Sequence, residues 1–147
     1  MKKSILFILV ATLIISMIAG CGTQPAEPAN PSQPSESKGS KSGEGKTIGI
    51  SLTSKALART NLDSIYLSEY LKELGYEVII QFSEGDVNVQ NSQIETMVGL
   101  GIDGLIVSPS DGTGLTNAME ICHENDVKVC VYDALVMNSP YVEYYAT

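Results

Sequence analysis

Few side chains in this 147-residue sequence could carry out catalysis or bind a metal. His123 is the only histidine, and it stands among acidic residues near the end of an expected helix, so no histidine-based metal cluster can form. Cys122 and Cys130 fall at apolar positions, where unpaired cysteines pack as small hydrophobic residues; an oxidising compartment would also permit a disulfide. The loops offer no nucleophile, base and orienting acid together. The sequence therefore predicts no enzyme, no metal site and no cofactor.

Nucleotide chemistry also lacks a motif in the right place. The segment 99–104 reads Gly-Leu-Gly-Ile-Asp-Gly, but it lies between an expected helix and the following strand. A dinucleotide fingerprint must instead follow a strand and open a helix, so this segment predicts a helix end and a tight turn. No phosphate-binding P-loop pattern occurs. The third strand ends in Val107-Ser108-Pro109, without the aspartate that a response regulator would place there.

Strand and helix patterns alternate along the second part of the chain, from about Lys46 onward. Continuous apolar runs predict strands over 47–52, 77–82, 104–107, 127–132 and 141–145. Helical spacing of apolar residues predicts helices over 61–74, over 88–100 and around 115–122. Such alternation, with continuously apolar strands, is typical of βαβ units. It predicts an α/β fold with a parallel sheet and flanking helices.

Helix ends and buried faces can also be predicted. Thr60 with Asp63 would cap the first helix, Gly75 would end it, and Ser110 or Asp111 would cap the third. The second helix is expected to turn Ile94, Met97 and Val98 inward. The first is expected to present one apolar side, formed by Leu62, Ile65, Tyr66, Tyr70, Leu71 and Leu74. Ligands of parallel sheets bind beyond the strand ends, so the loops to examine are 53–61, 83–88, 108–114 and 133–140.

The amino terminus predicts export. Lys2 and Lys3 precede an apolar run from Ile5 to Ile18, which is too short for a comfortable bilayer span and fits a secretory signal peptide over 1–20. The following Ile18-Ala19-Gly20-Cys21 resembles the lipobox of bacterial lipoproteins. That resemblance implies cleavage before Cys21 and attachment of a lipid to its thiol. An uncleaved anchor helix with an incidental cysteine is the alternative.

Composition separates a tether from a domain. Residues 21–45 are rich in Pro, Ser, Gly, Lys and Glu, cannot bury enough apolar surface to fold, and predict a disordered tether. Residues 46–147 suffice for one domain. Loss of Lys2 and Lys3 with the signal peptide would move the net charge from −8 to about −10. This charge argues against nucleic acid as a partner and against electrostatic adhesion to anionic lipid.

Three segments of the domain resemble the type I periplasmic sugar-binding proteins. They are Gln93-Ile94-Glu95-Thr96-Met97-Val98, then 101–109 (Gly-Ile-Asp-Gly-Leu-Ile-Val-Ser-Pro), then 127–133 (Val-Lys-Val-Cys-Val-Tyr-Asp). Within that family the chain is most similar to the xylose-binding and multiple-monosaccharide-binding receptors of ABC transporters. The resemblance runs from about Thr47 to Thr147. It implies one lobe with the flavodoxin-like strand order, a monosaccharide ligand and a membrane permease as partner.

Three residues match positions at which the family contacts sugar. Asp133 stands where the family has an aspartate in a Tyr-Asp-Arg or Phe-Asp-Arg motif, with Ala134 in place of the arginine. Arg59 matches an arginine of a Glu-Arg-Trp motif, without the tryptophan, and Ser108 ends the third strand at a frequent ligand contact. A solvated helix start for Arg59, a turn residue for Asp133 and a cap for Ser108 are the structural alternatives.

The family's receptors have two lobes, whereas this sequence resembles the amino-terminal lobe only. We therefore expect a truncated receptor with impaired sugar binding, anchored through Cys21 on the outer face of the cell membrane. Other roles remain open: a sensing receptor of the same fold that acts on a membrane kinase or chemoreceptor, a free-standing interaction domain, and a non-functional remnant.

Overall fold

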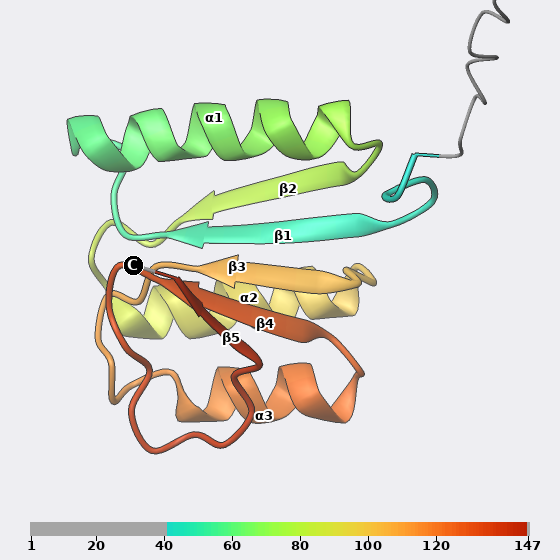
Figure 1. The fold of residues 1–147 in the computed structure, drawn as a ribbon. Coiled ribbons are helices and arrows are strands. Elements are labelled where there is room, and N and C mark those ends of the chain that lie inside the picture. Colours follow the sequence, from blue (N-terminus) through green and yellow to red (C-terminus); the bar gives the residue numbers. More distant parts are fainter. Residues whose placement is uncertain (1–40, 147) are drawn as a thin grey trace, which may run out of the picture. The chain divides into compact units, whose positions relative to one another are not determined.

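The computed structural model describes residues 41–146, which belong to one folded unit. The expected signal peptide, Cys21 and the tether up to residue 40 lie outside the described residues. Strands and helices alternate as the sequence predicts (Figure 1). The elements are β1 (Thr47–Leu52), α1 (Ala58–Glu73), β2 (Glu77–Phe82), α2 (Val87–Gly99), β3 (Gly104–Val107), α3 (Thr116–Glu124), β4 (Lys128–Tyr132) and β5 (Tyr144–Ala146). None of the helices between residues 41 and 146 has the length and apolar character that a membrane span requires.

The five strands form one parallel sheet in the order β2-β1-β3-β4-β5. The predicted α/β class and flavodoxin-like strand order are therefore confirmed. Because the chain crosses from β1 to β2 on one side and reaches β3 on the other, the topological switch point lies between β1 and β3. The strands end at a common side of the sheet, on the left in Figure 1. We call this side the carboxyl edge.

Two helix ends follow from local chemistry. Gly75 comes just after α1 with φ +95°, a left-handed conformation that glycine adopts without a steric penalty, as predicted. The 99–104 segment is confirmed as a helix end and turn, because α2 stops at Gly99 and Gly101 has φ +82°. At the other end of α2, the Asp86 carboxylate accepts hydrogen bonds from the amides of Asn88 and Val89.

Both cap predictions for helix starts are wrong. Helix α1 begins at Ala58, so Thr60 lies inside its first turn, where its side chain is buried rather than capping. Helix α3 begins only at Thr116. The Asp111 carboxylate is already occupied earlier, by the amides of Thr113 and Gly114, and forms a turn that precedes the helix.

Helices α2 and α3 cover one face of the sheet, and the main hydrophobic core lies beneath them. Leu105 and Val107 of β3 point to this face and are fully buried, as are Val129 and Val131 of β4. The helices contribute Ile94, Met97 and Val98, as predicted, together with Ala118, Met119 and Cys122. We call this face the closed face.

The opposite face is covered, among the described helices, by α1 alone. Ile48 points to this side and lines a pocket with Leu71 of α1 and with Leu74, the residue after the helix. Its neighbour Gly49 abuts Met97 on the closed side. Helix α1 packs over β1 and β2. The side chains of β3 and β4 that point to this face (Ile106, Cys130 and Tyr132) are only partly buried. We call it the open face.

The apolar side predicted for α1 is not a buried one. Leu62, Ile65, Tyr66 and Tyr70 are 43–64% exposed, whereas Leu71 and Leu74 are partly buried. The helix buries Thr60 and Ser64 instead. Apolar residues surround more of α1 than the sheet covers, so helical spacing alone could not identify the side that faces it.

The folded unit begins earlier than the predicted boundary at Lys46. Residues 41–45, assigned to the tether from composition, form a turn in which the Gly43 amide donates to the Leu74 carbonyl at 3.0 Å. Gly43 is buried against Tyr76, and a Cβ at this position would collide with the tyrosine ring. Composition missed this contact because it depends on the absence of a side chain.

The two cysteines of the described part are free, which confirms the unpaired interpretation. Cys122 is buried in the core of the closed face. Cys130 lies on β4 between Val129 and Val131 and lines the same pocket of the open face as Ile48. Because successive residues of a strand point to opposite faces, the sheet separates the two thiols.

Candidate functional site

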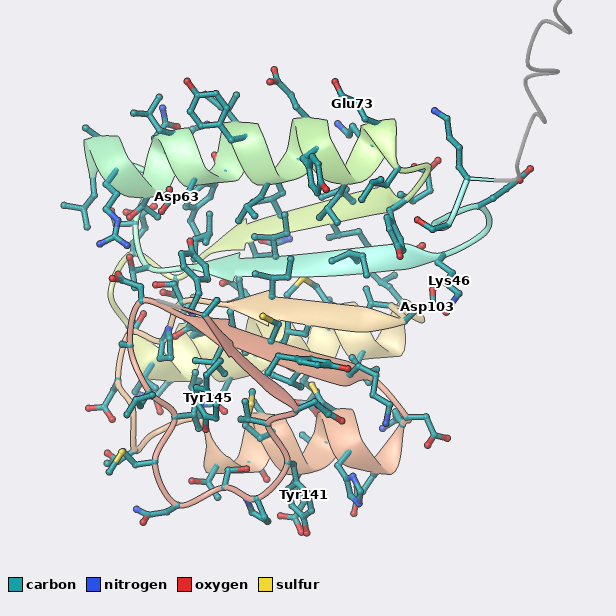
Figure 2. The ribbon with its side chains drawn as sticks, in the orientation of Figure 1. Lys46, Asp63, Glu73, Asp103, Tyr141 and Tyr145 are labelled. Carbon is teal, nitrogen blue, oxygen red and sulfur yellow. The ribbon has the colours of Figure 1, made fainter. Side chains whose placement is uncertain are left out.

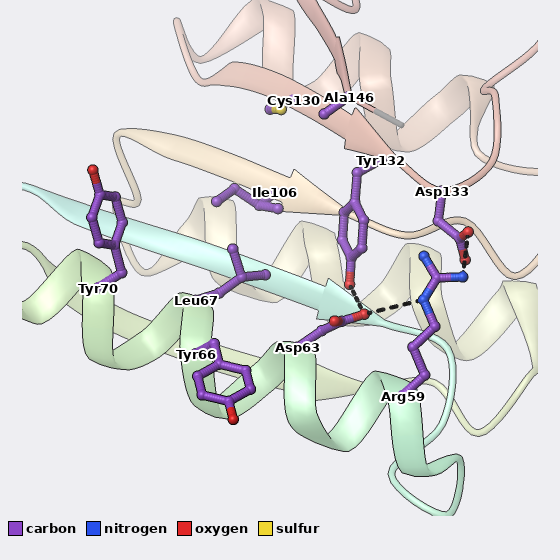
Figure 3. A pocket seen from close by; sticks show the side chains of 10 residues that line it. All are labelled: Arg59, Asp63, Tyr66, Leu67, Tyr70, Ile106, Cys130, Tyr132, Asp133 and Ala146. Atoms are coloured by element: carbon purple, nitrogen blue, oxygen red, sulfur yellow. Dashed lines mark hydrogen bonds and ion pairs between the residues drawn. The ribbon is translucent and has the colours of Figure 1, made fainter.

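Arg59 and Asp133 meet at the carboxyl edge, although 73 residues separate them in the sequence. An Arg59 Nη1 atom lies 2.8 Å from Asp133 Oδ1, and Arg59 Nε lies 3.8 Å from Asp63 Oδ2 (Figure 3). Arg59 sits in the first turn of α1, and Asp133 follows the last residue of β4. The fold therefore joins two of the three predicted site residues in one ion pair.

The backbone at Asp133 is unusual for a residue with a side chain. Its φ is +71°, in the left-handed region that aspartate tolerates better than most residues. Its amide donates to the carbonyl of Ala146 at 3.2 Å, so the first residue after β4 is tied to the end of β5. Figure 3 shows the carboxylate directed at the Arg59 guanidinium.

Tyr132 completes the polar cluster. Its hydroxyl donates to Asp63 Oδ2 across 3.5 Å, the long end of the hydrogen-bond range. Burial, followed by the negative charge of Asp63, raises the pKa of this hydroxyl well above its usual range. The hydroxyl therefore stays protonated and acts as a donor. We call Arg59, Asp63, Tyr132 and Asp133 the edge cluster.

The edge cluster retains the capacity to bind a polar ligand. The side chains of Arg59 and Asp133 are 67% and 43% exposed. A guanidinium has five N–H donors and a carboxylate about four acceptor sites, so one mutual contact leaves most of them unused. Charge-assisted hydrogen bonds to hydroxyl groups are among the stronger kinds. The arrangement suits a small molecule with adjacent hydroxyls.

Ser108 lies elsewhere in the structure. It directly follows β3, its amide donates to the Ser51 carbonyl at 2.9 Å, and it is only 5% exposed. Its carbonyl accepts from Gln90 Nε2 at 3.0 Å. Ser108 therefore supports the carboxyl edge from inside, whereas Arg59 and Asp133 form its surface.

Gln90 is a residue that the sequence interpretation missed. It is fully buried on α2, where it precedes Ile94 by four residues and Met97 by seven. This spacing places a polar amide in the apolar stripe of the helix. A buried amide must find hydrogen-bond partners, so a glutamine at such a position was the available signal.

A pocket of about 480 Å³ extends from the edge cluster along the open face. Its walls come from α1 and from the partly buried side chains of β3 and β4 (Figure 3). Tyr66, Tyr70 and Tyr132 are among the lining residues. The chain has no tryptophan, so tyrosine rings supply the aromatic surface near the cluster.

The remaining candidate groups lie away from this edge. His123, near the end of α3, is exposed and stacks on Tyr141 with ring centres 4.3 Å apart. Among residues 41–146, no group of three or more His, Cys, Asp or Glu side chains is arranged to hold a metal ion. Figure 2 shows where Tyr141 lies, beside α3.

Comparison with known proteins supplies independent relatives. A family model described as a periplasmic binding protein domain matches residues 61–147. The multiple sugar-binding periplasmic receptor ChvE of Rhizobium radiobacter is 38% identical over 101 residues, which cover 69% of this chain and 28% of the receptor. The D-xylose-binding periplasmic protein of Haemophilus influenzae is 33% identical over 92 residues, which cover 63% of this chain and 28% of that protein.

A solved structure agrees with these relatives. The crystal structure of an ABC transporter solute binding protein from Clostridium phytofermentans, with bound β-D-glucose, superposes with a TM-score of 0.68 at 37% identity. The superposition covers 69% of this chain and 32% of that one. The chain thus spans about 28% of the length of each of these two curated relatives.

Proposed function

Because the chain belongs to the periplasmic binding protein domain family, we propose that it supplies one side of a monosaccharide-binding site and presents the sugar to a membrane permease. One observation carries this proposal: Arg59 and Asp133 converge in an exposed ion pair at the carboxyl edge. Sugar-binding and glucose-bound relatives support a monosaccharide as the ligand. The proposal assigns no enzymatic step to the chain.

Within this site, Arg59 and Asp133 contact the sugar directly. The Asp133 carboxylate accepts hydrogen bonds from two adjacent hydroxyls, and the guanidinium donates to a third sugar oxygen. Ser108, predicted as a contact, acts in this proposal by holding the strand end behind them. Because the chain spans 28% of the length of ChvE, we expect the site on this chain alone to bind weakly.

The experiment is a titration of the isotopically labelled full chain with glucose, xylose, arabinose and galactose, followed by NMR. We expect chemical-shift changes centred on the amides of Arg59 and Asp133, with a millimolar dissociation constant, equivalent to roughly 4 kcal/mol. Asp133→Asn should abolish the changes. Glu120→Gln is the matched control, because it makes the same chemical change at an exposed position on α3.

Two results would decide against the proposal. Shift changes that Asp133→Asn and Glu120→Gln leave equally intact would place sugar binding elsewhere. Micromolar affinity, about 8 kcal/mol, would show that this chain needs no further contacts and contradict the one-sided site.

We also propose that Cys21 carries a lipid and holds the domain at the outer face of the cell membrane, with residues 22–40 as tether. The support is the sequence alone: the signal-peptide pattern and the small residues before Cys21. Cys21→Ser should move the protein from the membrane fraction to the soluble fraction after expression. Retention of the variant in the membrane would instead favour an uncleaved anchor helix.

A further inference from the structure

One buried amide connects the ends of two neighbouring strands, β1 and β3, near the carboxyl edge. Gln90 Nε2 donates to the Ser51 hydroxyl of β1 and to the Ser108 carbonyl that follows β3, each at 3.0 Å. Gln90 Oε1 accepts from the Ser110 amide at 2.8 Å. Both ends of a fully buried side chain are therefore engaged.

The network continues to the end of β2. The Ser110 and Ser83 hydroxyls lie 2.7 Å apart, and the Ser83 hydroxyl donates to the carbonyls of Leu52 and Thr53, each at 3.2 Å. Since Ser83 follows β2 and Thr53 follows β1, the contacts reach the start of the loop that leads into α1. That helix carries Arg59 in its first turn.

A second tie holds the same loop at its surface. The Glu84 carboxylate accepts from the Ser54 hydroxyl at 2.6 Å and from the Lys55 amide at 3.3 Å. These hydrogen bonds, chiefly that from Ser54, hold the pKa of the Glu84 carboxyl below its usual range. The loop before α1 is thus attached to the loop after β2 both at the surface and inside.

We propose that Gln90 is a positioning residue for the sugar site, acting through the 108–110 turn and Ser83 on the loop that places Arg59. This inference rests on the proposed function. A buried polar network with every member paired favours one arrangement of its parts, because each alternative leaves a polar group without a partner. From its position on α2, the Gln90 side chain reaches the ends of β1 and β3 together.

The first test measures amide hydrogen exchange in the full chain in detergent, for the native sequence and for Gln90→Met. Methionine keeps the length of the side chain and removes all three hydrogen bonds. In the variant, the exchange rate of the Ser110 amide should rise by a factor at least about ten times larger than the factor for the Met119 amide. The Met119 amide reports on the core of the closed face. Equal acceleration at both amides, or none at Ser110, would overturn the proposal.

Gln93→Met is the matched control. Gln93 lies one turn further along α2, and its Nε2 atom donates at 2.9 Å to the Phe82 carbonyl at the end of β2. The control removes a glutamine hydrogen bond from the same helix without touching Ser108 or Ser110. Its Ser110 amide should exchange as in the native chain. Gln90→Glu should restore part of the protection, because a carboxylate still accepts from the Ser110 amide.

The second test repeats the sugar titration with Gln90→Met. We expect at least about a fivefold loss of affinity, equivalent to about 1 kcal/mol, with the Met119 amide still protected. Native affinity in this variant would overturn the proposal. If the native chain binds no sugar, the proposed function fails, whereas the exchange experiment still decides whether Gln90 holds the edge.

Discussion

The closed and open faces of the sheet use the same strands but bury them to different degrees. Leu105 is 1% exposed beneath α2 and α3, whereas its neighbour Ile106 points to the open face and is only partly buried. The same contrast separates Val131 from Tyr132 on β4. The difference arises from what covers each face, because the strands themselves are apolar on both.

This contrast explains where the polar chemistry lies. The edge cluster and its pocket lie on the open side, where Arg59 and Asp133 remain in contact with solvent. The Gln90 network lies next to the closed side, where every polar group needs a protein partner. The open side of the carboxyl edge is thus available to a ligand, and the closed side holds the strand ends in place.

The largest effect is expected from shortening a core side chain on the closed face. Leu105→Ala should lower the free energy of unfolding by about 2–5 kcal/mol, because it removes buried methyl groups and leaves a cavity. Ile106→Ala, on the adjacent residue, should lower it by only about 1 kcal/mol, since part of that side chain is already in water. Urea denaturation of both variants measures the difference.

The adjacent pair makes this a strict comparison. Both substitutions change the same strand, and both remove branched aliphatic side chains of equal size. Equal losses of stability would mean that the open face is covered in solution by something beyond residues 41–146 of this chain.

A smaller difference between the two faces is expected in the rates at which their cysteine thiols are modified. Burial raises the pKa of both, and that of Cys122 to about 12, so the reactive thiolate of Cys122 is scarce at neutral pH. Under native conditions a maleimide should modify Cys130 at least about tenfold faster than Cys122, because Cys122 also needs the core to open first. Peptide mass spectrometry separates the two sites.

The pH dependence sharpens this prediction. A thiol whose pKa is raised on folding favours the protonated form, so its contribution to stability is present below about pH 9 and is lost as the pH rises further. Modification of Cys122 should therefore accelerate steeply above that pH. A rate for Cys122 equal to that for Cys130 would contradict the burial difference between the faces.

Sequence patterns predicted the strands of the sheet better than they predicted how the helices pack on it. The bounds of β1, β2 and β3 were predicted to the residue, because apolar strands bounded by polar or glycine residues leave few alternatives. Arg59 and Asp133 were identified through the family resemblance, and the fold brings them together. The Arg59–Asp63 contact is an i,i+4 pair within α1. The contacts of these two residues with Tyr132 and Asp133 depend instead on how α1 is placed over the sheet, which no local pattern encodes.

Two of the errors in the sequence interpretation have a common physical cause. The exposed side of α1 was expected to be buried, because periodicity locates an apolar stripe but not the surface that covers it. Gln90 was passed over for the converse reason: its polarity hid the fact that it occupies a core position. Both errors concern tertiary contacts between segments far apart in the sequence.

The smallest effect is expected at an exposed side chain of α1, the helix that covers part of the open face. Tyr66 is 64% exposed on α1, so Tyr66→Ser should change the free energy of unfolding by no more than about 0.5 kcal/mol. Tyr76 is the matched control, because its ring packs against Gly43 and is partly buried, and Tyr76→Ser should lower stability by about 2 kcal/mol. Urea denaturation compares the two. A loss at Tyr66 as large as at Tyr76 would show that the exposed side of α1 is packed in solution, and that the contrast between the two faces of the sheet does not hold.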